Sequence, residues 1–180
     1  MAQTKWTLDP MHSEITFKVK HLMISTVTGQ FRKFNVAATT EGDDFTKANV
    51  EATIDVSSID TNNEQRDGHL KSDDFFSAAN HNEISFKSTK FESKGDEGKL
   101  YGNLTIKGTT QPVVLNVEIG GIVVDPYGQT KAGFTVTGKV NRKEFGLTWS
   151  AVTEAGSIVV GDEIKFTAEV QLVKQVLVEA

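Results

Sequence analysis

Hydrophobic and polar residues alternate with a period of two along most of the chain. Near the N-terminus, Ile15, Phe17 and Val19 alternate with charged and hydroxyl-bearing residues. The same alternation returns at 50–56, 84–86, 104–106, 113–119 and 164–172. Strands that turn one face to a core and the other to water have this pattern, which is typical of antiparallel sheets. We therefore expect an all-β protein made of half-buried antiparallel strands.

Short groups of turn-forming residues separate these segments. Each group contains glycine and aspartate, and the groups lie at 41–44, 95–98, 125–128 and 160–162. Such groups predict tight hairpin connections. About eight strands joined by short turns predict a barrel or a sandwich, and strands of about ten residues favour a tall barrel. We expect the whole chain, residues 1–180, to form one domain.

One segment, residues 61–77, interrupts the alternation. Thr61 and Glu64 have the spacing of a capping box, which predicts a short helix beginning at Asn62. The segment is too short to form a domain and lies between two strand-like segments. We expect a helical excursion from the barrel.

Composition and charge narrow the possible functions. The chain has a net charge of −5 and no cysteine, so it offers no basic surface for nucleic acid, no disulfide and no thiolate metal site. The four histidines lack metal-ligand spacing, and no serine stands in a nucleophile elbow. No secretory signal precedes the first strand, and no apolar run is long enough to span a bilayer. We expect a cytoplasmic protein without metal, nucleic-acid partner or stable membrane insertion.

The inward-facing positions of the strands form the first candidate site. These positions are Phe17, Val19, Phe34, Val36, Ile54, Val56, Phe86, Leu104, Ile106, Leu115, Val117, Phe134, Val136 and Phe166. Small residues recur on the same faces, at Ala38, Ala52, Gly102, Ala132, Gly138 and Ala168. The large residues either fill a dry core or, where the small ones leave space, surround a lumen. A long apolar ligand in such a lumen would be held at roughly 25 cal/mol per Å² of buried apolar surface, with few polar contacts.

The helical excursion forms the second candidate site. Its members are Arg66, His69, Leu70, Phe75 and Phe76. We expect Phe75 and Phe76 to close one end of the barrel. Arg66 or His69 either meets a ligand head group or, with Asp67, belongs to a polar network that ties the helix to the barrel. Near the C-terminus, Arg142 precedes a predicted turn, where we expect it to donate hydrogen bonds to backbone carbonyls.

Several motifs, in order along the chain, resemble the YceI-like polyisoprenoid-binding proteins. The motifs are WTLDPMHS at 6–13, IDT at 59–61, RDGHLKS at 66–72, DFF at 74–76, EISF at 83–86, GNLTIKG at 102–108, and NR at 141–142 with EFG at 144–146. The resemblance runs from about Lys5 to Val173. It implies a lipocalin-like antiparallel β-barrel whose apolar tunnel holds a polyprenyl lipid or an isoprenoid quinone, and pairing as a homodimer. Many members carry a signal peptide and work in the periplasm, and this chain departs from that pattern.

Three functional hypotheses follow. The favoured one is a non-enzymatic protein that binds and carries or sequesters a long-chain isoprenoid lipid, in quinone biosynthesis or stress tolerance, without a cofactor. The second is an enzyme that acts on a lipid head group through Arg66, Asp67 and His69. The third is an interaction module with a close-packed interior and no small ligand.

Overall fold

Antiparallel strands dominate the described part of the chain, which comprises residues 3–22, 24–148 and 160–175 in a computed structural model. The strands are β1 (Gln3–Leu8), β2 (Glu14–His21), β3 (Ser25–Phe31), β4 (Phe34–Glu41), β5 (Asp44–Asp55), β6 (Ile59–Asp60), β7 (Glu83–Lys94), β8 (Glu97–Ile106), β9 (Thr109–Val124), β10 (Thr130–Asn141) and β11 (Val160–Lys174). The helices are α1 (Glu64–Lys71) and the 3-10 turns η1 (Pro10–His12), η2 (Val56–Ser58) and η3 (Arg142–Phe145). Among these residues, each helix falls short of the length and apolar character needed to cross a bilayer.

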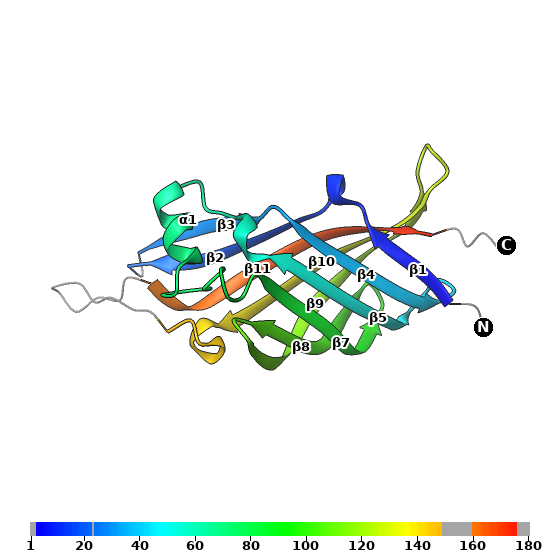
Figure 1. The fold of residues 1–180 in the computed structure, drawn as a ribbon. Helices are drawn as coiled ribbons and strands as arrows, with labels where there is room; N and C mark the ends of the chain where they lie inside the picture. Colours follow the sequence, from blue (N-terminus) through cyan, green and yellow to red (C-terminus); the bar gives the residue numbers. More distant parts are fainter. Residues whose placement is uncertain (1–2, 23, 149–159, 176–180) are drawn as a thin grey trace.

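Eight strands close the barrel, as the alternation and the turns predicted. Their order is β1, β4, β5, β7, β8, β9, β10 and β11, and the ring closes where Trp6–Leu8 pairs with Leu172–Lys174. The remaining strands branch from β11, because β2 pairs with its earlier part and is followed by β3 and β6. The barrel is elongated, with α1 at one end and the start of β1 and the end of β11 at the other (Figure 1).

Two adjoining clusters of buried side chains fill the barrel. One surrounds Trp6, which is fully buried and whose Nε1 donates a hydrogen bond of 2.9 Å to Thr40 Oγ1. The other extends to the end covered by α1 and includes Phe31, Phe76 and Phe145. Four partly buried side chains pack against both clusters: Phe34, Ala52, Phe134 and Ala168.

Three local predictions are wrong. The helix begins at Glu64 with Asn63 as its N-cap, because the Thr61 hydroxyl donates to Asp67 instead of capping. The predicted turn at 160–162 belongs to β11, where a shift in pairing with β2 accommodates its glycine and aspartate. Val56 leaves the strand and opens η2, where it is buried.

Candidate functional site

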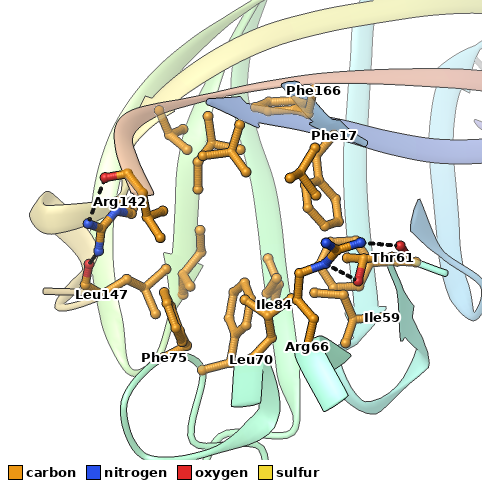
Figure 2. A pocket seen from close by; sticks show the side chains of 18 of the residues that line it. Phe17, Ile59, Thr61, Arg66, Leu70, Phe75, Ile84, Arg142, Leu147 and Phe166 are labelled. Carbon is orange, nitrogen blue, oxygen red and sulfur yellow. Dashed lines mark hydrogen bonds between the residues drawn. The ribbon is translucent and has the colours of Figure 1, made fainter. Parts of the chain in front are cut away.

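An apolar cavity of about 310 Å³ lies inside the barrel at the end covered by α1 (Figure 2). Its walls come from β2, β3, β5, β6, β7, β8, β10 and β11, from α1 and the turn that follows it, and from η3 and its following residues. Most wall residues are aliphatic or aromatic, and the polar ones are Lys20, His21, Thr61, Arg66, His69 and Arg142. The cavity is near the lower limit of the roughly 300–1,000 Å³ typical of small-molecule sites.

The cavity brings together many of the predicted residues. Those that line it are Phe17, Val19, Ile54, Arg66, His69, Leu70, Phe75, Phe76, Leu104, Ile106 and Phe166. A second apolar cavity of about 80 Å³ lies further along the barrel and is lined by Val36, Val117, Phe134 and Val136 from the predicted set. The predicted residues that line neither cavity are Phe34, Val56, Phe86 and Leu115. The predicted inward residues therefore lie around two cavities, with four of them lining neither.

Phenylalanine rings in the wall of the larger cavity lie against glycines of neighbouring strands. Phe166 pairs directly with Gly138 on one side and with Phe17 on the other, and Phe17 pairs with Gly29. A methyl group at Gly138 would lie 2.6 Å from Cζ of Phe166, and one at Gly29 would clash with the ring of Phe17. The glycines thus accept the rings along the wall, and the space predicted at Gly138 is occupied by Phe166.

The two phenylalanines after α1 form the cover of the cavity. Phe75 and Phe76 are both buried, and the Phe76 ring meets Phe31 of β3 edge-on at a centroid distance of 6.2 Å. Their backbone is held in a tight turn, in which the Phe75 amide donates to the Ser72 carbonyl and the Phe76 amide to the Leu70 carbonyl. This places both rings at the end of the barrel, where the sequence predicted them.

Arg66 and Asp67 belong to a hydrogen-bond network centred on Thr61. Arg66 Nε donates to Thr61 Oγ1 at 2.8 Å and Nη2 donates to the Thr61 carbonyl at 2.5 Å. The Thr61 hydroxyl and amide both donate to Asp67 Oδ1, at 2.6 and 2.9 Å. Because Thr61 is buried at the cavity wall, the network fastens α1 to the end of β6 (Figure 2). The guanidinium of Arg66 also faces the cavity rim.

The His69 side chain contacts two residues outside the 66–69 cluster. Its Nε2 lies 2.9 Å from Asp74 Oδ2, and its ring meets Phe75 edge-on at 5.1 Å. The carboxylate of Asp67 instead accepts from Thr61. In the described residues, the acidic and histidine side chains form no group of three suited to a metal ion.

Arg142, the first residue of η3, lies in the wall of the cavity. It is almost fully buried, and it donates from Nη1 to the Leu147 carbonyl at 2.6 Å and from Nε to the Gly161 carbonyl at 3.0 Å. Burial lowers the pKa of its guanidinium, and the charge of Asp162 opposes that shift. The predicted bonding to backbone carbonyls is confirmed, and Arg142 ties η3 to the start of β11.

Sequence reasoning did not place several wall residues. Ile15 and Ile84 lie on the same inward faces as the predicted Phe17 and Phe86, so alternation alone is sufficient to find them. Ile59 and Leu147 carry no such signal, because one belongs to a strand of two residues and the other follows a 3-10 turn.

Comparisons with known proteins agree with this architecture. Residues 6–172 match the YceI-like domain family. The chain is 39% identical over 169 residues to a UPF0312 protein of Staphylococcus epidermidis, covering 93% of this chain and 96% of that protein.

Two solved structures show the same fold. The YCEI protein of Campylobacter jejuni superposes with a TM-score of 0.74 at 33% identity, covering 87% of this chain and 90% of that one. A polyisoprenoid binding domain from Saccharophagus degradans superposes with a TM-score of 0.67 at 15% identity, covering 94% and 98%. With one family matched from Trp6 to Leu172 and a barrel of the same form, the chain belongs to the YceI-like family.

Proposed function

We propose that this protein binds an isoprenoid lipid, of the polyprenyl or isoprenoid quinone type, with the chain inside the larger cavity. The observation that carries the proposal is a cavity of about 310 Å³ whose wall is mostly aliphatic and aromatic. Burying apolar ligand surface there contributes about 25 cal/mol per Å². The description of the Saccharophagus degradans domain as polyisoprenoid binding supports this choice among apolar ligands.

The polar side chains of the cavity wall determine the orientation in which the ligand binds. Arg66, His69 and His21 line the cavity together with its apolar wall. A polar or anionic head group at these side chains places the chain toward the middle of the barrel. The protein then acts as a carrier or a store that shields the chain from water, without chemistry on the ligand.

The network at Thr61 favours this proposal over an enzyme that uses residues 66–69. Arg66 and Asp67 both direct hydrogen bonds to Thr61, and His69 pairs with Asp74. A general base needs a polar atom within reach of a substrate proton and a partner that orients it. Arg66 and Asp67 instead hold the helix in place through Thr61.

The proposal is tested by mass spectrometry of organic extracts from the purified protein and by thermal unfolding with added farnesol. We expect a co-purified isoprenoid and a higher unfolding midpoint with farnesol. Val140→Phe, which fills the cavity, should abolish that rise, whereas Val114→Phe, at a half-exposed position on β9, should preserve it. Repeated extracts without isoprenoid, together with no farnesol effect on the unaltered protein, would overturn the proposal.

A further inference from the structure

The interior of the barrel is interrupted between its two apolar cavities. The larger cavity lies at the α1 end, and the smaller one is lined by Phe45, Phe91 and Leu172 near the Trp6 cluster. Three large side chains from the predicted inward set line neither cavity. We call these three, Phe34, Phe86 and Leu115, the waist.

Strand pairing places the waist at the boundary. Phe86 pairs with Leu104, which lines the larger cavity, and with Ala52, whose other partner Val36 lines the smaller one. On β9, two strands from Phe86, Leu115 pairs with Leu100 of the smaller cavity.

Other contacts of the waist also reach both chambers. A methyl group at Gly138 would meet both Leu115 and Phe166 of the larger cavity, so these two side chains adjoin. Phe34 packs against both hydrophobic clusters. Each waist residue therefore lies between the chambers.

Small residues lie next to the waist residues on adjacent strands. Ala52 of β5 pairs with Phe86, and Gly102 of β8 lies under the Phe86 ring. Gly138 of β10 lies beside Leu115. A methyl group at Gly102 would lie 2.5 Å from Cζ of Phe86. These small neighbours cannot fill the space that a shortened waist side chain would leave.

We infer that the waist sets the length of chain that the protein encloses, with Phe86 as a specificity-determining residue. This inference rests on the proposed isoprenoid binding. A chain entering at the α1 end gains affinity with every isoprene unit until its tail reaches the waist. Further units stay outside the cavity and add little. The smaller cavity receives the tail only when the waist is opened.

Competition among prenyl alcohols of increasing length tests the inference. The protein is incubated with an equimolar mixture of geraniol, farnesol, geranylgeraniol and solanesol, and the bound alcohols are quantified by mass spectrometry. Each additional enclosed unit should raise binding about tenfold or more, because it buries several carbons. In the unaltered protein, the amount of bound alcohol should rise with the number of isoprene units and stop rising above a certain number, which we call the length limit.

A smaller side chain at the waist should raise the length limit. In Phe86→Ala, the length limit should be at least one isoprene unit longer than in the unaltered protein. Leu115→Ala is a second waist variant, to be used if circular dichroism shows that Phe86→Ala does not fold. Phe91→Ala is the matched control, since Phe91 lies on the same strand against Gly98 but lines the smaller cavity. It should keep the length of the unaltered protein.

The outcomes separate the inference from the proposed function. A longer limit in a folded waist variant, with an unchanged limit in Phe91→Ala, supports the waist as the stop. Unaltered protein whose binding rises without a limit through solanesol overturns the inference, as does a folded waist variant with the original limit. Unaltered protein that binds none of the alcohols overturns the proposed function and the inference with it.

Discussion

The ring of Phe166 lies over Gly138, its directly paired neighbour on β10, so closely that a methyl group on Gly138 would be 2.6 Å from the ring carbon Cζ. The same arrangement recurs in the wall of the larger cavity where Phe17 lies over Gly29. An aromatic ring laid on a glycine covers exposed backbone and keeps its bulk at the wall. The larger cavity exists because rings such as Phe166 and Phe17 lie along its wall.

Gly138→Ala should therefore shrink the cavity. The added methyl group pushes the Phe166 ring inward, and we expect farnesol affinity to fall about tenfold, the equivalent of one or two lost methylene contacts. Titration calorimetry measures the change. Gly133→Ala, on the same strand with open space around its Cα, is the control and should stay within about twofold. Equal affinities for the two variants would contradict the role of the Gly138–Phe166 contact.

Thr61→Val should loosen the attachment of α1. The change removes a hydroxyl that accepts from Arg66 and donates to Asp67, which leaves only the two bonds that the Thr61 backbone makes in the network. We expect a loss of about 1–3 kcal/mol in the free energy of unfolding, measured by urea denaturation.

Thr105→Val is the matched control for this prediction. It removes an equivalent hydroxyl pairing, with Thr110 on the outer surface of the barrel, and should cost less than about 0.5 kcal/mol. If the two variants lose the same stability, the Thr61 network does not anchor the helix.

Arg142→Met should be strongly destabilising. Two buried carbonyls, of Leu147 and Gly161, lose a charged donor, which predicts a loss of about 3 kcal/mol or more in the free energy of unfolding. Lys143→Met, at a half-exposed neighbour 3.4 Å from Asp162 Oδ1, should cost less than about 1 kcal/mol. A mild effect of Arg142→Met in chemical denaturation would show that the carbonyls find other donors.

The pH dependence of stability should depend on Asp9. The Lys131 ammonium, 2.7 Å from Asp9 Oδ2, holds the pKa of Asp9 at about 2; burial opposes this shift, and His12 adds to it. A folded pKa below the unfolded value stabilises the protein above about pH 4, and the stabilisation is lost as the pH falls toward 2.

Asp9→Asn tests this linkage. Thermal midpoints at pH 7, 4 and 2 should fall less steeply for this variant than for the unaltered protein, because the variant has no proton to take up at residue 9. Lys131→Met should flatten the same interval by removing the cation. Parallel curves for all three proteins would exclude the Asp9–Lys131 pair as the cause.

Much of the fold follows from local patterns. Alternation in segments such as 113–119 and 164–172 is enough to predict the inward faces, because each face is buried along its whole length. The branch at β11 is not predictable in this way. Its fifteen residues pair with β2 over the earlier part and with β1 at the end, and such a change of partner leaves the alternation intact.

The site was less predictable than the fold, because its shape depends on contacts between strands that are distant in sequence. The small residues Gly102 and Gly138 were expected to leave space, but rings from neighbouring strands occupy it. Arg66 could be placed at the end of the barrel, whereas its bond to Thr61 depended on where the helix begins. The division into two cavities arises from the packing of the waist, which no single strand encodes.

The central claim is that the cavity under α1 encloses an isoprenoid chain. A crystal structure of the protein with bound farnesol tests it most directly. We predict continuous density for the chain between Phe17, Leu70 and Phe166, with the hydroxyl end at the rim near Arg66. Farnesol bound elsewhere on the molecule, with these side chains packed as they are here, would contradict it.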